Sequence, residues 1–406
     1  MKLINKISFP DDWKPVKLKN IGDIFKGKGI SKSEIQSEGL PCVRYGEIYT
    51  EYQDWFSDTV SFISKDSALK SMQIKMGDVL FAGSGETPED IGRAIAYVSN
   101  NEAYAGGDIV IFRPEYNECG QFLGYLLNSD YVNQQKFQFA QGHSVVHLYG
   151  KNIEELEVVL PPLPEQKKIA AILSKWDELI ETQTQLIAAK EQQKKGLMQK
   201  LLTGELRFPG FEGEWEELEL NDIFNKIIGG GTPSRQNPLF WNGDIFWCTV
   251  KDFTNFNPNQ TQETITEQGL KSSASNLVQK GTLIIPTRMA IGKIAIFNVD
   301  VAINQDLKAL FLNDKAKNEF LYQWFNFYSE SISNLGTGST VKGIKLEELK
   351  TIEISLPPIK EQEKIANTLI ACDLEIQSLK DELEAIKLQK KGLMQQLLTG
   401  KIRVKV

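Results

Sequence analysis

The sequence predicts an α+β protein built as two divergent copies of one unit, in which a variable domain is followed by a long helix. The first observation is a repeat: residues 160–204 return as residues 356–400, with 23 of 45 positions identical, no gap and an offset of 196. The second is a heptad pattern of apolar residues within both copies of that segment. The third is a series of short apolar runs upstream of each copy, bounded by Gly, Asn and Asp as strands commonly are.

The repeat extends upstream of the helical segments with a drifting offset. Trp13 matches Trp215 at an offset of 202, and Gly92 matches Gly292 at an offset of 200. Insertions and deletions between the copies therefore fall in the upstream part, while the helical part aligns without a gap. We predict a first variable domain over residues 1–155, a central helical segment over 156–207, a second variable domain over 208–350 and a C-terminal helical segment over 351–406.

Each helical segment is expected to form one helix of about 39 residues, roughly 58 Å long at 1.5 Å per residue. The Pro-Pro pair at 161 and 162 prevents an earlier start, Glu165 suits the positive N-terminal end, and Gly204 is a suitable stop. All three features recur 196 residues later. The predicted apolar seam consists of Ile169, Leu173, Trp176, Ile180, Ile187, Leu197 and Leu201 in the first copy, and of Ile365, Leu369, Ile376, Leu379, Leu383, Ile386, Leu393 and Leu397 in the second. Lys194 and Lys390 occupy positions of the same seam.

Two arrangements can bury such a seam. A single heptad helix is most simply read as an oligomerising coiled coil. Two matched seams in one chain can instead pack against each other. We predict that they do so antiparallel, as two long helices that hold the variable domains at opposite ends and relate them by a pseudo-twofold axis.

The variable domains are expected to mix strands and helices. Helices are predicted at about 121–139 and 318–333. Loops that differ between two copies on a common frame are where binding specificity normally resides. The predicted strands are 78–82, 94–98 and 109–112 in the first copy, and 282–286, 294–297 and 307–312 in the second.

Composition indicates a globular protein with more than one core and restricts its partners. The 406 residues include 46 basic and 53 acidic side chains, a net charge of −7, whereas a freestanding nucleic-acid binder usually has an electropositive footprint. Any positive surface must therefore be local or belong to a partner. No apolar stretch is long enough for a signal peptide or a membrane helix, so a cytoplasmic protein without membrane contact is expected. The four cysteines form no C-x-x-C pair and predict neither a zinc site nor disulfides.

Motifs for catalysis are not found in the sequence. A loop beginning at Gly22 resembles a phosphate-binding loop but ends in Gly29, where a hydroxyl is needed to bind magnesium. The E-x-K spacing at Glu165 becomes E-x-E in the second copy, so a helix-end role explains it better than a nuclease. His143 and His147 are the only histidines and lack a third metal ligand. We predict no catalytic residue and no metal site.

The combined motifs resemble those of one family. L-P-P-[LI]-x-E-Q-x-K-I-A begins at Leu160 and again at Leu356, and K-K-G-L-M-Q-x-L-L-T-G closes each segment. G-G-G-T-P-S followed by W-N-G-D-I-x-W, over 229–247, resembles the opening of a target-recognition domain. Together these motifs resemble the specificity subunit of type I restriction-modification systems over nearly the whole chain. The first domain departs from the T-P-S form at residues 27–31, which indicates a different recognition subtype.

The resemblance implies a function. Each target-recognition domain would read one half of a bipartite, asymmetric site in double-stranded DNA, and the helices would set the gap and dock the partner subunits. Those partners would be two modification subunits, which methylate adenine with S-adenosylmethionine, and two restriction subunits, which use ATP and Mg²⁺. This chain would hold no cofactor and would not itself be an enzyme.

Candidate DNA-contacting residues follow from comparing the two copies. Basic residues common to both, Arg93 and Lys293, are expected to contact phosphate, although an exposed charge at a strand end explains them equally well. Unshared polar residues in loops are candidate base readers, because Arg, Lys, Ser and amide groups supply the donors that read base edges. The alternative for each is a solvated loop residue. These candidates are Arg44, Ser84 and His143 in the first domain, and Ser234, Arg235, Lys251 and Arg288 in the second.

Three other classes of function remain open from sequence. A coiled-coil scaffold would explain the helices but not two divergent domains on one frame. A self-contained methyltransferase or nuclease would need motifs that the sequence lacks. A specificity factor for a related single-chain modification system is the nearest alternative.

Overall fold

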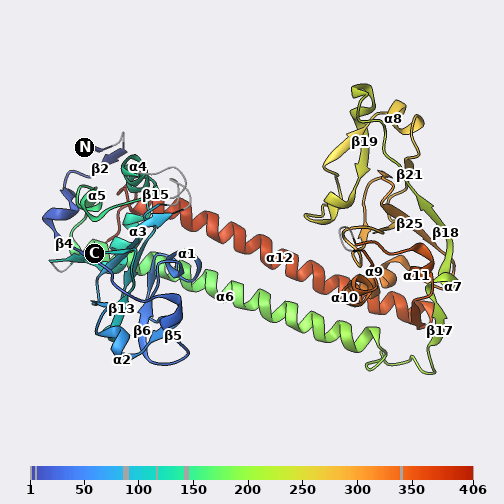
Figure 1. The fold of residues 1–406 in the computed structure, drawn as a ribbon, viewed down its shortest axis with the longest axis horizontal. Helices are drawn as coiled ribbons and strands as arrows, with labels where there is room; N and C mark the ends of the chain where they lie inside the picture. Colours follow the sequence, from blue (N-terminus) through green and yellow to red (C-terminus); the bar gives the residue numbers. More distant parts are fainter. Residues whose placement is uncertain are drawn as a thin grey trace. The chain divides into compact units, whose positions relative to one another are not determined.

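The computed structural model describes residues 2–4, 7–85, 91–115, 118–140, 146–338 and 342–405. His143 lies outside these residues. The chain forms two compact units, of which the first comprises Met1–Thr184 with Asp381–Val406 and the second Gln185–Lys380. Each unit contains one α+β domain together with parts of two long helices, α6 and α12 (Figure 1). The predicted fold class, α+β with a tandem duplication and two long helices packed together, is confirmed.

Two five-stranded sheets form the domain of the first unit. One has the order β4-β14-β10-β12-β7 and is parallel only between β12 and β7; the other has the order β5-β8-β6-β13-β9 and is parallel only between β6 and β13. Two-stranded pairs β1-β2, β11-β15 and β16-β3 complete the strands. The strands are β1 Lys2–Ile4, β2 Ile7–Phe9, β3 Lys14–Lys17, β4 Gly22–Lys26, β5 Ile35–Gln36, β6 Leu40–Val43, β7 Trp55–Phe56, β8 Ser61–Ile63, β9 Met72–Ile74, β10 Val79–Ala82, β11 Ser84–Gly85, β12 Ala94–Tyr97, β13 Ala103–Ala105, β14 Ile109–Pro114, β15 Val146–His147 and β16 Glu157–Leu160.

Strand β10, in the middle of its sheet, is apolar at every position because both faces of the sheet are covered. In β10, Val79 and Phe81 pack into one core, and Leu80 and Ala82 pack into another. Alternate residues of a strand point to opposite faces, so each core receives every second side chain. The helices that accompany the sheets are α1 Glu47–Thr50, α2 Lys65–Ala68, α3 Gly120–Leu127, α4 Asp130–Phe139 and α5 Gly150–Glu154, with 3₁₀ turns at Leu18–Asn20 and Lys32–Glu34.

The second unit repeats this plan with two four-stranded sheets. Their orders are β18-β25-β22-β23 and β20-β19-β24-β21, and β17 pairs with β26 as β3 pairs with β16. The strands are β17 Glu216–Glu219, β18 Phe224–Gly229, β19 Trp241–Cys248, β20 Glu263–Ile265, β21 Asn276–Val278, β22 Leu283–Pro286, β23 Ala295–Ile296, β24 Val301–Ile303, β25 Leu307–Leu312 and β26 Glu353–Leu356. The helices are α7 Leu220–Ile223, α8 Glu267–Lys271, α9 Asn318–Phe327, α10 Ser329–Asn334 and α11 Leu346–Lys350, with 3₁₀ turns at Pro238–Phe240 and Val250–Phe253.

The helix predicted over 121–139 is divided into α3 and α4, and the one predicted over 318–333 is divided into α9 and α10. Asn128 explains the first break. Its side-chain amide donates to the carbonyl oxygen of Ala94 at 2.7 Å and accepts from the amide nitrogen of the same residue at 3.0 Å. A side chain that pairs with the sheet in this way stabilises a turn in preference to a continuous helix.

The long helices are α6, Leu163–Leu202, and α12, Ile359–Leu397, and both pass from one unit into the other. In the first unit the early part of α6 lies beside the late part of α12, where Gln183 donates to Glu382 at 3.1 Å. In the second unit Lys194 pairs with Asp373 at 2.5 Å. The first unit also pairs Asp177 with Lys390, and the second also pairs Lys190 with Glu375. Within each unit, partner numbers fall along α12 as they rise along α6, so the packing is antiparallel. All fifteen apolar residues of the predicted seam are buried or half-buried.

The start of each long helix is held by a buried glutamate. Glu165 of α6 is 2% exposed and accepts from both Arg403 and the Trp13 indole, the latter at 3.2 Å. In the second unit Glu361 of α12 accepts two hydrogen bonds from Arg207, at 2.5 and 2.7 Å. The two arginines and the two glutamates are each related by the repeat offset of 196. The helix-end role predicted for Glu165 therefore includes an ion pair that the E-x-K pattern did not reveal.

Candidate nucleic-acid interface

An open depression in the second unit gathers three of its four predicted DNA-contacting cations. It has a volume of about 620 Å³ and is lined by Arg235, Lys251 and Lys293, together with Met289 and the acidic Glu263 and Asp306. A neighbouring hollow shares Asp306 with it and contains Arg288. The four cations come from three separate connections of one domain, since Arg288 and Lys293 share the loop between β22 and β23.

Arg235 is fixed by its neighbours in this depression. Its guanidinium lies 3.7 Å from the centre of the Trp241 ring and 5.1 Å from that of Trp247. Both terminal nitrogens donate to the carboxylate of Glu263, one of them at 2.9 Å. This hydrogen bonding raises the pKa of Arg235 and lowers that of Glu263. A guanidinium held by a carboxylate and stacked on an aromatic ring is rigid, and it offers few free donors to a base.

Lys251 of the depression and Arg288 of the neighbouring hollow are also exposed. Lys251 extends from the 3₁₀ turn 250–253, whose start is capped by the Thr249 hydroxyl. Arg288 is 66% exposed, and its nearest carboxylate, that of Asp306, is 3.7 Å away. Ser234 is exposed, and its carbonyl oxygen accepts from the Trp241 indole at 3.1 Å. Lys251 and Arg288 are therefore the cations best placed to reach a ligand.

In the first unit the structure places Ser84 and Arg93 at the same end of the central sheet. Ser84 follows β10, and its hydroxyl is 3.1 Å from Nδ1 of His147. The carbonyl oxygen of Arg93 accepts from the amide of Ala82, two residues before Ser84. Arg44 lies on a different loop, where its Nε donates at 2.7 Å to the buried carboxylate of Glu47. His147, which the sequence offered only as half of an incomplete metal site, thus lies beside a predicted base reader.

The shared cations Arg93 and Lys293 hold equivalent backbone contacts. Arg93 donates to the carbonyl oxygen of Tyr52 at 3.0 Å, and Lys293 donates to that of Phe253 at 2.8 Å. Each side chain therefore joins the segment before a strand, β12 or β23, to a neighbouring connection. These contacts support the strand-end alternative at least as strongly as a phosphate contact, since the same groups are already engaged.

The unshared residues Ser84 and Arg288 are equivalent positions of the two domains. Each comes two residues after the end of a matching strand, β10 or β22. Ser84 pairs across a short ladder with His147, and Arg288 forms the corresponding bridge with Gly343. The backbone frame is thus repeated, whereas the side chains presented on it differ. This is the arrangement expected of two sites that read different sequences.

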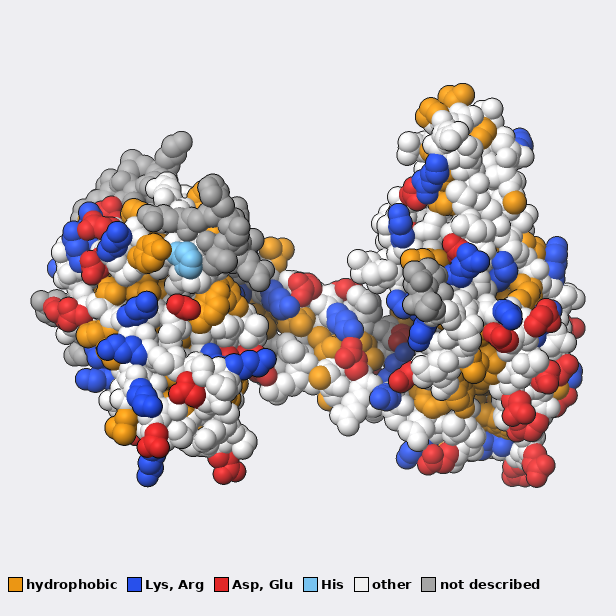
Figure 2. Space-filling model, viewed as in Figure 1, with side chains coloured by type: hydrophobic (Ala, Val, Ile, Leu, Met, Phe, Trp, Pro, Cys, Tyr) orange, Lys and Arg blue, Asp and Glu red, His pale blue; other side chains and the backbone are white. Residues whose placement is uncertain are grey.

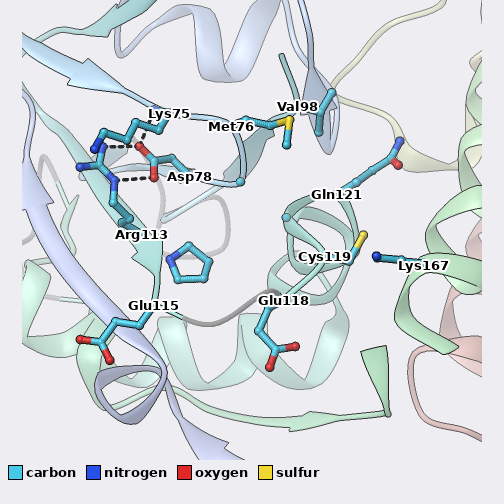
Figure 3. Close-up of a pocket in the computed structure, with 13 residues that line it drawn as sticks. Lys75, Met76, Asp78, Val98, Arg113, Glu115, Glu118, Cys119, Gln121 and Lys167 are labelled. Carbon is cyan, nitrogen blue, oxygen red and sulfur yellow. Dashed lines mark hydrogen bonds and ion pairs between the residues drawn. The ribbon is translucent and has the colours of Figure 1, made fainter. Parts of the chain in front are cut away.

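A second cavity, of about 570 Å³, lies at the opposite end of the central strands in the first unit (Figure 3). Arg113 makes a bidentate ion pair with Asp78 along one wall, and Lys167 from α6 approaches Cys119 on the other. Burial raises the pKa of the Cys119 thiol, which therefore remains protonated and is a poor nucleophile. None of the predicted DNA-contacting residues lines this cavity.

The distribution of charge agrees with a local interface. On the face shown in Figure 2, Lys and Arg side chains of both units are interspersed with Asp and Glu.

Among the described residues, no group of three or more His, Cys, Asp or Glu is arranged to hold a metal ion. Within the same part of the chain, no helix combines the length and apolar character needed to cross a membrane.

Sequence reasoning did not identify two features of these sites. Trp241 was recognised as part of a motif but not as the ring on which Arg235 stacks. The ion-pair partners Arg207 and Arg403 lie three residues beyond the repeat as it was delimited, and extending the repeat alignment would have found them.

Comparisons with known proteins agree on one family. A family model described as the type I restriction modification DNA specificity domain matches residues 10–192 and 212–388. A protein of Methanocaldococcus jannaschii, whose name assigns it provisionally as the specificity subunit of the type I restriction enzyme MjaX, is 30% identical over 411 residues, or 98% of this chain and 95% of that protein. The crystal structure of the type I restriction-modification S subunit from M. genitalium is similar to 98% of each chain, with 17% identity and a TM-score of 0.60. A chain from a structure on assembly of the type I system is similar over 97% of this chain and 100% of its own length, with 19% identity and a TM-score of 0.63.

Proposed function

Because this chain belongs to the type I restriction modification DNA specificity family, we propose that it is the non-catalytic subunit that reads DNA for such a complex. Each unit would recognise one half of a bipartite, asymmetric target in duplex DNA. The observation that carries the proposal is the pair of equivalent loops after β10 and β22, which present Ser84 in one unit and Arg288 in the other on the same backbone frame.

The residues proposed to contact bases are the unshared ones of these loops. Lys251 and Arg288 have the exposure and the donors that base edges or phosphates require. Arg44 and Ser84 serve the first half-site, together with His143, which lies outside the described residues. We propose phosphate contacts for Arg93 and Lys293 and base contacts for Ser234 and Arg235. Like Arg44 and Ser84, these four residues also have partners within the protein.

The two long helices would set the gap between the half-sites and dock two modification subunits. Their seams are filled, yet some apolar side chains remain on their outer faces. Leu374 and Leu388 of α12 are 67% and 71% exposed. Exposed leucines on helices that need no further packing are suited to contact a partner protein. S-adenosylmethionine, ATP and Mg²⁺ would be held by the modification and restriction subunits.

The test is single-molecule sequencing of adenine methylation in cells that express this chain with its modification subunit. A bipartite motif that appears only when this chain is present supports the proposal and defines the target. Exchanging the Ser84 and Arg288 loops should alter each half of that motif separately. A soluble complex that leaves no motif would contradict the proposal and favour a scaffold.

A further inference from the structure

Met289 is an exposed apolar side chain on the loop between β22 and β23 of the second unit. It is 71% exposed and lines the depression that contains Lys251 and Lys293. Its neighbour Arg288 is 66% exposed. The Met289 side chain is therefore open to an apolar contact at the edge of a depression that also presents cations.

The backbone at Met289 is held in a conformation that side chains rarely adopt. Its φ is +65°, and the amide of Ala290 donates to the carbonyl oxygen of Arg288 at 2.7 Å, which closes a tight three-residue turn. Strain of this kind persists only where the surrounding structure imposes it. Such sites are often functional, and glycine would relieve the strain.

Hydrogen bonds on both sides of the turn hold the backbone of Met289 in this strained conformation. The amide of Met289 donates to the carbonyl oxygen of Lys342 at 3.0 Å, and the amide of Thr287 donates to that of Asp306 at 2.8 Å. These hydrogen bonds hold the loop backbone in place without a ligand, and the methionine side chain projects from that backbone.

The equivalent residue of the first unit is Gly85. It follows Ser84 as Met289 follows Arg288, and a Cβ there would lie 3.3 Å from both Ile91 and the Tyr49 hydroxyl. A side chain at this point of the first domain would crowd Ile91 and Tyr49, whereas the second domain presents one to solvent. The apolar group is thus a property of the second half-site alone.

We propose that Met289 is an apolar wedge that inserts at a base step of duplex DNA in the second half-site, with Lys251 and Arg288 on the flanking phosphates or base edges. This inference rests on the proposed DNA-reading function. Apolar side chains, methionine included, are used by DNA-binding proteins to part base steps, and pyrimidine–purine steps open most easily. The step beneath Met289 should therefore be of that kind.

The test uses the complex of this chain with its modification subunit and a duplex carrying the motif found by methylation sequencing. Met289→Gly introduces the residue that the first unit has at the equivalent position, and it removes the backbone strain. The variant should therefore be at least as stable as the wild type. We expect specific affinity to fall about 10-fold to 100-fold, as for a lost base contact. The salt dependence of binding should not change, because no phosphate contact is lost. Lys251→Ala should instead lower the salt slope by about one.

Met76→Gly is the matched control, since Met76 is 58% exposed in the first unit and lines the cavity that holds no predicted DNA contact. It should leave affinity unchanged. The fluorescence of 2-aminopurine placed at the expected base step should increase when the wild-type complex binds, because unstacking relieves its quenching. It should not increase when the Met289→Gly complex binds. Unchanged affinity and unchanged fluorescence in Met289→Gly would overturn the wedge while leaving the DNA-reading function intact. Failure of the wild-type complex to bind its motif would instead contradict the proposed function.

Discussion

Lys136 of α4 is a buried lysine without a carboxylate partner among the described contacts. It is 1% exposed, and its Nζ donates to the carbonyl oxygen of Gly92 at 2.7 Å. Burial, reinforced by the nearby charge of Arg93, lowers the pKa of Lys136 to about 7. The neighbouring Arg93 side chain is itself engaged with a backbone carbonyl. A buried ammonium beside a second cation opposes folding whenever it carries a proton.

The effect of Lys136 on stability should depend on pH. Between its folded pKa of about 7 and its unfolded value near 10.4, the unfolded chain binds the extra proton, so stability should rise with pH by up to about 1.4 kcal/mol per unit. Below pH 7 both states are protonated and the penalty is complete. Lys136→Met should therefore raise the free energy of unfolding at pH 7 and reduce its increase between pH 7 and 9.5 in urea titrations.

Lys136→Arg is the complementary variant. Its guanidinium cannot deprotonate, so it should be destabilising across the whole range without the rise that the wild type shows. An equal pH dependence of unfolding in the wild type and both variants would show that Lys136 does not titrate in this window.

At the scale of the helices, a buried cation joins α12 to α6 and to the domain of the first unit. Nζ of Lys390 lies 2.5 Å from Asp177 of α6 and 3.1 Å from Asp54, and its side chain is only 10% exposed. Burial lowers the pKa of Lys390, but the two carboxylates together raise it above its usual value. In the second unit Lys194 and Asp373 occupy the matching positions. A polar pair inside an apolar seam favours one register of the helices over others.

Lys390→Met should destabilise the first unit by about 3–5 kcal/mol, because it leaves two largely buried carboxylates without their cation. The control is Lys387→Met on the same helix, where the pair with Glu384 is exposed and worth less than about 1 kcal/mol. Urea unfolding followed by tryptophan fluorescence would compare them, since Trp55 lies beside Asp177. Equal midpoints for the two variants would contradict this account of the helix contact.

At the scale of the whole chain, the net charge of −7 must be reconciled with a DNA-reading role. Phosphate neutralisation supplies much of the affinity of DNA-binding proteins, and the cations of the second unit share their surface with Glu263 and Asp306. Subunits that bind alongside would have to supply the remaining positive charge.

The isolated chain should therefore bind its duplex weakly, and the complex with the modification subunit should bind it at least 10-fold more tightly, with a steeper salt dependence. Fluorescence anisotropy with a labelled duplex, titrated at two salt concentrations, measures both quantities. Equal affinity with and without the modification subunit would mean that this chain supplies the phosphate contacts alone.

Sequence alone determined the features that depend on local pattern. The offset of 196, the heptads and the Pro-Pro and Gly boundaries predicted α6 and α12 closely, because helix periodicity and helix termination are local properties. The buried strands β10, β14, β22 and β25 were found because sheets covered on both faces leave continuous apolar runs.

Only the tertiary structure decided which side chains meet. Arg403 reaches Glu165 across 238 positions of sequence, and Lys390 reaches Asp54 across 336. In the candidate site, residue type alone made Arg235 and Arg288 equal candidates for base contacts. The structure distinguishes them, because Arg235 stacks on Trp241 and Arg288 is exposed. The sequence did not single out Met289, because the features that distinguish it are its positive φ and the cations that line the same depression. Such long-range contacts and exposures depend on how sheets and loops pack, which local pattern does not specify.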